Sequence, residues 1–273
     1  MDAPSVALVG AGQMGGALLR GWLKAIQRGG SLVLSVLEPD FDPVLERELA
    51  AAGAVLNAPG AKPADVIVLA VKPQQLQAAG EQIRALVQPH SIVLSIMAGV
   101  TTGTLIEMFG AQKVVRAMPN TPGQIGQGVT AFVASLACTE SDLLLIAQLL
   151  EPLGGVERLP NERLMDVITA VAGSGPAYVF LLAEVLAAAA EMEGLEAEVA
   201  SRIARQTVAG AGALMLESKD SPALLRKQVT SPGGSTGAAL DVLRAADGLM
   251  PLLRRAVAAA TQRSRELGRG SQP

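Results

Sequence analysis

The sequence predicts an α/β fold in which a parallel sheet wound with helices is followed by an all-helical region. Short apolar runs alternate with helical patterns through the first half of the 273 residues, which is typical of βαβ units with helices on both faces of the sheet. The alternation ends near Leu159, and apolar residues then recur at spacings of three and four. We therefore expect one domain over residues 1–160 and an all-helical domain over residues 161–273.

Six apolar runs of the first domain are candidate strands because they are short, rich in aliphatic residues and bounded by turn-forming or polar residues. These runs are Val6–Val9, Leu32–Leu37, Val66–Val71, Ile92–Met97, Val114–Ala117 and Val129–Val133. Helical patterns lie between them, including Val44–Ala52 and Leu76–Val87.

The first candidate strand leads into a G-x-G-x-x-G turn made by Gly10, Gly12 and Gly15, and an amphipathic helical pattern follows. This strand–turn–helix setting is the one that the dinucleotide-binding fingerprint requires. Gly10 allows the tight turn, Gly12 lets the pyrophosphate approach, and Gly15 lets the helix pack on the strand. We therefore predict a Rossmann domain; the alternative is a structural turn in a nucleotide-free domain.

Unusual loops follow three other candidate strands. One carries Lys72 and Pro73, the next carries Ala98 and Gly99, and the third places Asn120 between two prolines. Each taken singly is compatible with an ordinary turn. Ligands of doubly wound sheets bind beyond the carboxyl ends of the strands, so the three together favour a binding site.

A second glycine-rich segment, residues 228–240, runs from a polar loop into an apolar helical pattern. Its residues 232–234 are expected to form a tight turn, and Ser235 or Thr236 to cap the helix that follows. The free N–H groups and positive end of such a helix suit a carboxylate. The alternative is a loop and a helix cap with no ligand.

Composition excludes several classes of protein. The net charge is −3 and there is no basic block, so nucleic acid is not an expected partner. The single cysteine, Cys138, excludes an internal disulfide, and no His pair or carboxylate cluster suggests a metal. The only histidine, His90, is expected at the N-terminal end of a strand, away from the site. No signal peptide is recognisable.

The stretch of residues 167–183 carries no charge but contains glycine, serine and proline at positions 173–176. It is shorter than a usual membrane span, and we interpret it as two buried helical pieces around a turn. A helix that is apolar on most faces needs cover, so a subunit interface is expected here.

Missing residue types limit the chemistry. A dehydrogenase acting on an alcohol usually needs a base such as His, Lys or Tyr, and the helical half offers only Lys219 and Lys227 as lysines. A reductase acting on a protonated imine needs no strong general acid. It needs positioning and hydrogen bonds, which serine and threonine hydroxyls and loop N–H groups supply.

Taken together, these motifs closely resemble those of pyrroline-5-carboxylate reductases, nearly from end to end. The matching segments are Gly10–Gly15, Ala70–Gln74, Arg116–Pro122, Asp166–Tyr178 and Val229–Leu240. The resemblance implies an all-α dimerisation domain after the Rossmann domain, and a homodimer that often assembles into a decamer of five dimers. It also implies cytoplasmic reduction of 1-pyrroline-5-carboxylate to L-proline by NADPH or NADH, the last step of proline biosynthesis.

The resemblance further implies site residues. The Thr236 hydroxyl would hydrogen-bond the ring nitrogen, Ser231 would assist it, and the loop N–H groups would hold the carboxylate. The substrate-binding set is Glu162, Asn120, Gln228, Gly234, Ser235 and Thr236. The cofactor-binding set is Gly10, Gly12, Gln13, Met14, Gly15, Glu38, Ala70, Val71, Lys72, Pro73, Ala98 and Gly99. Without the resemblance, Glu162 is interpreted as a first-turn helix carboxylate favoured by the helix dipole.

Glu38 ends the second candidate strand and bears on cofactor choice. An acidic residue there usually accepts a hydrogen bond from a free ribose 2′-OH and repels a 2′-phosphate, whereas NADPH-preferring members of the family commonly carry Ser, Thr or Arg. We therefore predict use of NADH or of both cofactors. The alternative is that Glu38 points to solvent and that backbone groups hold the phosphate.

Two other functions remain as alternatives. A related Rossmann hydroxyacid dehydrogenase would need a lysine soon after Gly173-Ser174-Gly175, and none follows there. A non-catalytic dinucleotide-sensing module would keep the G-x-G-x-x-G turn but would not need the loop of residues 231–236.

Overall fold

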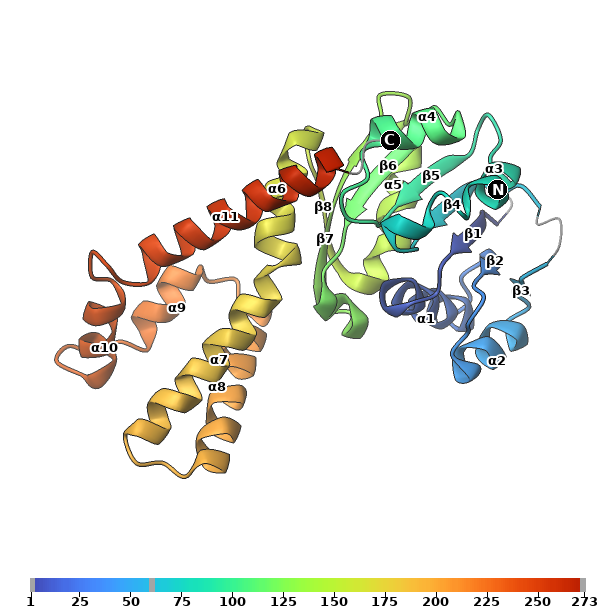
Figure 1. Cartoon of the computed structure of the whole chain (residues 1–273). Helices are drawn as coiled ribbons and strands as arrows, with labels where there is room; N and C mark the ends of the chain where they lie inside the picture. The colour runs from blue at the N-terminus through green and yellow to red at the C-terminus, as the bar shows by residue number, and fades with distance from the viewer. Residues whose placement is uncertain (1–2, 59–61, 271–273) are drawn as a thin grey trace. The chain divides into compact units, whose positions relative to one another are not determined.

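The computed structural model describes residues 3–58 and 62–270, and its elements are labelled in Figure 1. The chain divides into two compact units. The first contains the described residues up to Gly173 and those from Thr261 onward, and the second is Ser174–Ala260. The predicted fold class, a Rossmann α/β domain followed by a helical domain, is confirmed.

The first unit contains an eight-stranded sheet in the order β3-β2-β1-β4-β5-β6-β7-β8. Neighbouring strands are parallel except β6 and β7, which are antiparallel. The predicted parallel arrangement does not extend to this pair, because only a short connection containing the turn η2 (Thr121–Ile125) joins the two strands and a parallel return needs a longer crossover. The strands are β1 Ser5–Val9, β2 Val33–Leu37, β3 Val55–Leu56, β4 Val66–Leu69, β5 Ile92–Ser95, β6 Lys113–Met118, β7 Gly128–Ala134 and β8 Gly154–Arg158.

Helices cover both faces of the sheet, as Figure 1 shows. Alternate residues of β1 enter different hydrophobic clusters: Val6 and Leu8 pack with residues of α1, α2 and α5, and Ala7 and Val9 with residues of α3 and α4. The pattern Leu76–Val87, expected to be one helix, is a turn that leads into the shorter α3. The helices are α1 Gln13–Gln27, α2 Pro43–Ala51, η1 Pro73–Gln75, α3 Gly80–Leu86, α4 Thr102–Phe109, α5 Glu140–Leu150, η3 Glu151–Leu153, η4 Glu162–Leu164, α6 Met165–Ile168 and the π-helical turn Thr169–Gly173.

The second unit is entirely helical. Helices α7 and α8 form a hairpin whose turn contains Gly194 at φ +98°, a conformation that glycine adopts at little cost. Helix α11 begins in this unit, and its residues from Thr261 onward belong to the first. The helices are α7 Gly175–Met192, α8 Ala197–Glu217, α9 Pro222–Gln228, α10 Ser235–Leu243 and α11 Leu249–Gly270.

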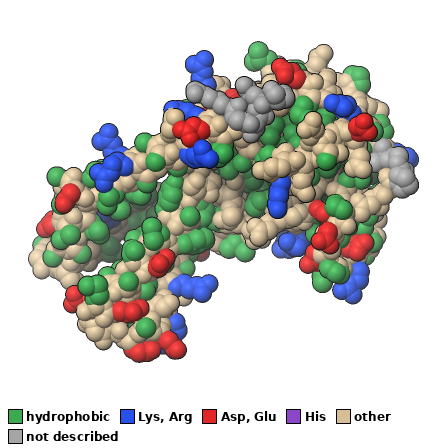
Figure 2. All heavy atoms as spheres, viewed as in Figure 1, with side chains coloured by type: hydrophobic (Ala, Val, Ile, Leu, Met, Phe, Trp, Pro, Cys, Tyr) green, Lys and Arg blue, Asp and Glu red, His purple; other side chains and the backbone are tan. Residues whose placement is uncertain are grey.

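Helix α7 has no buried residue within the described chain. Val179, Phe180, Leu182 and Val185 are all more than a third exposed, and hydrophobic side chains are visible on the surface of the helices in Figure 2. These side chains are therefore exposed in the single chain, and their expected burial in a subunit interface stays a prediction. A break does separate α6 from α7. By length and composition alone, the helical stretch Glu162–Met192 is apolar enough to cross a membrane.

The expected domain boundary at residue 160 follows the last strand, which ends at Arg158. The division into compact units falls later, at Gly173, because α6 packs on β7 and Glu162 of η4 bonds to Arg116 of β6. The assignment of functional domains to residues 1–160 and 161–273 stays a prediction.

Candidate dinucleotide pocket and substrate loop

The turn from β1 into α1 is built around glycines. Gly10 has φ +96°, and a Cβ atom on it would lie 2.8 Å from the backbone of Ala70. A Cβ atom on Gly15 would lie 2.1 Å from the carbonyl oxygen of Gly10. Gly12, in contrast, has nothing within 4 Å of its Cβ position and starts α1 without a side-chain cap. The turn therefore leaves open space at the positive end of a helix, which suits a phosphate.

A cavity of about 810 Å³ opens beside this turn. Of the residues predicted to bind the cofactor, six line it: Gly10, Gly12, Glu38, Ala70, Val71 and Lys72. Gln13, Met14, Gly15, Pro73, Ala98 and Gly99 are not among its described lining residues. Their roles as cofactor-binding residues stay predictions.

Sequence reasoning missed several lining residues. Asn57 is the most informative, because it is the only described residue other than glycine with positive φ, at 45°. Asparagine tolerates that conformation better than most residues. An asparagine shortly before a Pro-Gly pair could therefore have indicated a turn at the end of strand β3. The other missed lining residues are Val9, Leu37, Pro39, Ala58, Gln75, Ala78, Ala79, Gln82 and Ala85.

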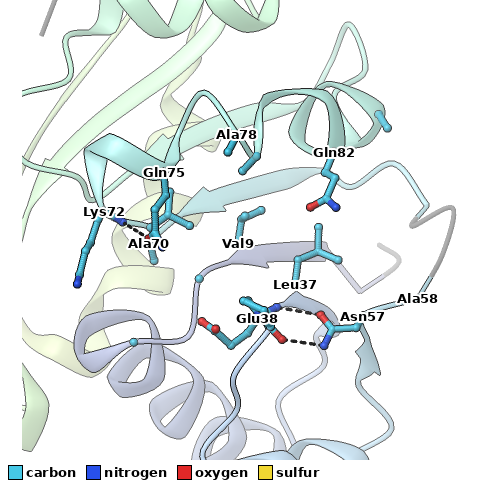
Figure 3. Close-up of a pocket in the computed structure, with 16 residues that line it drawn as sticks. Val9, Leu37, Glu38, Asn57, Ala58, Ala70, Lys72, Gln75, Ala78 and Gln82 are labelled. Carbon is cyan, nitrogen blue, oxygen red and sulfur yellow. Dashed lines mark hydrogen bonds between the residues drawn. The ribbon is translucent and has the colours of Figure 1, made fainter.

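Glu38 is held from both ends at the edge of the cavity. The Ala11 N–H donates to Glu38 Oε2 at 2.6 Å, and the Asp40 N–H donates to Oε1 at 3.0 Å. The side chain of Asn57 clamps the backbone: its Oδ1 accepts from the Glu38 N–H at 2.9 Å, and its Nδ2 donates to the Glu38 carbonyl at 2.7 Å. Figure 3 shows the carboxylate extending from the end of β2 toward the glycine-rich turn.

The pocket offers little positive charge to a second phosphate. Lys72 is the only cationic residue among its described lining residues. In Figure 3 Lys72 and Glu38 extend from different strand ends, Lys72 after β4 and Glu38 after β2. No arginine lines the described part of the cavity, so the end near Glu38 is acidic.

Two further predicted residues lie in loops of the same sheet. Ala98 is exposed and Gly99 has φ +78°, both in the loop after β5. Asn120 follows β6, and its Oδ1 accepts a hydrogen bond from the Val129 N–H at 2.9 Å. The side chain of Asn120 thus fixes the loop after β6 against the start of β7.

Glu162 begins η4 and is bound on both carboxylate oxygens. Arg116 Nη1 donates to Oε1 at 2.8 Å, the Thr102 N–H donates to the same oxygen at 3.0 Å, and Thr102 Oγ1 donates to Oε2 at 2.5 Å. Burial alone would raise the pKa of Glu162, but the hydrogen bonds from Thr102 and Arg116 outweigh it and lower the pKa below its ordinary value. The carboxylate is therefore charged and held in one orientation.

The predicted substrate loop lies between α9 and α10 in the second unit. The N-cap of α10 is Gly234, with no side-chain hydrogen bond, so the expectation that Ser235 or Thr236 caps this helix is wrong. The Gly234 N–H instead donates to the Ser231 carbonyl at 3.1 Å, and a Cβ atom on Gly234 would lie 2.7 Å from Ser231 Oγ. Ser235 and Thr236 thereby occupy the first turn, where backbone N–H groups have no partner within the helix.

Three other residues named from the sequence have clear positions. Gln228 Nε2 donates to Asp220 Oδ2 at 2.8 Å, and its role in binding substrate stays a prediction. Cys138 is half-buried, with its Sγ 3.6 Å from Ser135 Oγ. His90 lies at the N-terminal end of β5, as expected. Within the described residues no group of three His, Cys, Asp or Glu side chains is arranged to hold a metal ion.

Two protein-family profiles match the chain. Residues 162–267 match the family described as pyrroline-5-carboxylate reductase dimerisation. Residues 5–99 match the family described as NADP oxidoreductase, coenzyme F420-dependent.

Similar proteins cover nearly the whole chain. Pyrroline-5-carboxylate reductase of Pseudomonas aeruginosa is 37% identical over 98% of both chains, and pyrroline-5-carboxylate reductase 1 of Bacillus subtilis is 33% identical over 97% of this chain and 90% of its own. Among solved structures, a pyrroline-5-carboxylate reductase from Coxiella burnetii is 34% identical with a TM-score of 0.88, over 97% of this chain and 99% of its own. Plasmodium falciparum pyrroline carboxylate reductase with NADP bound is 28% identical with a TM-score of 0.76, over 98% and 99%.

Proposed function

Because this chain belongs to the pyrroline-5-carboxylate reductase family, we infer its mechanism from the residues that the two units contribute. The protein is an oxidoreductase that reduces 1-pyrroline-5-carboxylate to L-proline with NAD(P)H. The main support for this mechanism is the cavity of about 810 Å³ at the glycine-rich turn between a strand and a helix. The match of residues 162–267 to the dimerisation region of this family supports it further.

The residues around the cavity fit a dinucleotide. The first turn of α1, with Gln13, Met14 and the three glycines, would hold the pyrophosphate through backbone N–H groups. Glu38 would contact the adenine-side ribose, and the strand end Ala70–Pro73 would line the dinucleotide. Ala98 and Gly99 would lie beside the nicotinamide, which supplies the hydride when it is bound.

The loop between α9 and α10 is proposed to hold the substrate. The N–H groups at the start of α10 would bind its carboxylate, with the helix dipole adding to the attraction. The Thr236 hydroxyl would hydrogen-bond the ring nitrogen, assisted by Ser231. The imine is already protonated when it binds, so these groups orient it and no strong acid is required. Gln228 in the second unit, and Asn120 and Glu162 in the first, stay predicted substrate-binding residues.

Cofactor oxidation with and without the cyclic imine tests the function. We expect the reduced cofactor to be consumed only when 1-pyrroline-5-carboxylate is present, with proline formed in equal amount. A hydroxyacid dehydrogenase would instead reduce a keto acid, and a sensing module would bind NADH without consuming it. Either result would contradict the proposed mechanism.

We also propose that the enzyme is a cytoplasmic homodimer that assembles into a decamer of five dimers. The match of residues 162–267 to a dimerisation family supports the dimer, and so does the apolar face of α7 that the single chain leaves open. Larger exposed apolar patches usually mark interaction sites. A second copy, rather than lipid, would cover Glu162–Met192.

Sedimentation at low micromolar concentration should therefore show a dimer or a larger species. Phe180→Glu, at a side chain that is 66% exposed on α7, should shift the protein toward smaller or aggregated species, because it places a charge in the interface. Leu136→Glu is the matched control, since Leu136 is fully exposed in the first unit. A compact wild-type monomer of 27.9 kDa would contradict the dimer.

A further inference from the structure

We propose that Glu162 and Arg116 are positioning residues for hydride transfer. Together with Thr102 they form a clasp, meaning the three hydrogen bonds that the Glu162 carboxylate accepts from the Arg116 side chain, the Thr102 hydroxyl and the Thr102 backbone N–H. The clasp sets the loop after β5 against strand β6. The inference rests on the proposed placement of the nicotinamide beside Ala98 and Gly99.

The clasp joins segments that are distant in the sequence. Thr102 is the first residue of α4 and lies three residues after Gly99. Arg116 lies in β6, where it pairs with Ser95 of β5, and β6 leads directly to Asn120. Glu162 comes from η4, after the last strand, and binds both. One carboxylate therefore joins the start of α4, which follows the loop proposed to lie beside the nicotinamide, to strand β6.

Arg116 is the only charged residue in the buried part of the described chain, at 8% exposure. A buried ion pair adds little net stability, because the cost of removing both charges from water offsets their attraction. The pair does fix geometry: the guanidinium approaches from the sheet, and Thr102 supplies two donors from the start of α4. The Arg116–Glu162 pair is therefore better explained by its effect on the orientation of the joined segments than by its effect on the free energy of unfolding.

The orientation matters for the reaction because hydride transfer depends steeply on distance. A misplacement of about 1 Å remote from the reacting atoms can cost on the order of 100-fold in rate. Strand β5 ends at Ser95, although the Ile96 N–H still donates to the Leu69 carbonyl at 3.0 Å, and Ala98 and Gly99 follow in the loop. Asn120, after β6, is fixed separately through its hydrogen bond with the Val129 N–H. The clasp adds a polar connection between the start of α4 and β6 to the apolar packing of α4 against this strand.

The test uses the full-length enzyme in its native assembly. The double variant Arg116→Met/Glu162→Met removes both charges together and so avoids an unpaired buried charge. We expect its thermal unfolding to stay near that of the wild type and its kcat to fall by about 10- to 100-fold. Thr102→Val, which removes one donor at nearly constant shape, should lower kcat by a smaller factor of about 3 to 10.

Two measurements distinguish a loss of positioning from a general loss of folded structure or cofactor binding. The isotope effect on kcat with cofactor deuterated at the transferred hydrogen should rise, because hydride transfer becomes slower relative to the other steps. Inhibition by ADP-ribose, which lacks the nicotinamide, should stay within about twofold, because that fragment binds at the other end of the pocket. Glu140→Ala is the control, since it removes a carboxylate paired with Arg158 at the surface, and it should change neither quantity.

A third variant tests the placement on which the inference rests. Ala98 is exposed, so Ala98→Leu adds bulk without disturbing the core, and it should weaken NADH binding while sparing ADP-ribose. If it does so while the double variant keeps wild-type kcat and isotope effect, the clasp has no positioning role and the cofactor placement stands. If Ala98→Leu changes nothing, the placement is wrong and the inference fails with it.

Discussion

Replacing Thr236 with alanine is expected to lower kcat/KM for the cyclic imine by roughly 10- to 1000-fold, a loss of about 1.4 to 4 kcal/mol of transition-state stabilisation. Thr236 lies in the first turn of α10. Among the residues that the structure describes, its hydroxyl has no hydrogen-bond partner, so it is available to the ring nitrogen. A bond that orients the imine for hydride attack contributes mainly in the transition state, so kcat should carry most of the loss.

Steady-state kinetics with the imine varied at saturating cofactor measure this effect. Cofactor affinity should be nearly unchanged, because Thr236 belongs to the second unit and the cavity to the first. Thr230→Ala is a matched control: its hydroxyl donates to the Arg226 carbonyl at 2.7 Å and has no proposed contact with substrate. Thr236→Ser should recover much of the activity. Wild-type turnover in Thr236→Ala would remove the hydroxyl from the mechanism.

The order of strands and helices in the first unit could be predicted because each buried strand is a compact apolar run. Strands β3 and β8 were missed for physical reasons. Strand β3 has only two residues, Val55–Leu56, and β8 has the sequence Gly-Gly-Val-Glu-Arg, which is largely polar. Neither bears the pattern of a buried strand, since both lie at edges of the sheet.

The cap of α10 shows where local rules mislead. Serine and threonine are favoured at N-caps, yet the structure places Gly234 there. Space at that position is limited by Ser231 Oγ, 2.7 Å from where a Cβ atom would lie. The hydroxyl residues lie one and two positions further on, in the first turn of the helix. That arrangement depends on the fold of the loop and is not visible in residue preferences.

Contacts between distant residues were the least predictable part of the site. The glycine-rich turn could be predicted because the role of each glycine follows from its spacing to its neighbours in the sequence. Arg116 and Glu162, in contrast, lie 46 positions apart. The clamp of Asn57 on Glu38 spans 19 positions. The burial of helix α7 could not be predicted for a different reason. Its apolar sequence predicts that the helix surface is covered, but it does not show whether the same chain or a second copy covers it.

Replacing Glu38 with serine should raise the NADPH/NADH ratio of kcat/KM by at least about tenfold, or ~1.4 kcal/mol. In the structure the Glu38 carboxylate is fixed by the N–H groups of Ala11 and Asp40 at the cavity edge. In the proposed placement of the cofactor it would accept from a ribose 2′-OH and would oppose a 2′-phosphate as a like charge, with no arginine among the described lining residues to offset it. Serine removes the repulsion and adds a donor for the phosphate.

Glu38 also holds the glycine turn in place, because its carboxylate accepts a hydrogen bond from the Ala11 N–H. A second variant is therefore needed to separate the effect of the charge from the effect of this hydrogen bond. Glu38→Gln keeps an acceptor for the Ala11 N–H but loses the charge, so it should raise the ratio with less loss of NADH activity than Glu38→Ser. Asp40→Asn is the control, since Asp40 is exposed and does not line the described cavity. The shift should shrink with added salt if repulsion across partly solvated space dominates. An unchanged NADPH/NADH ratio of kcat/KM in both Glu38 variants would mean that the carboxylate does not reach the ribose. Its role would then be to hold the glycine-rich loop and not to select the cofactor.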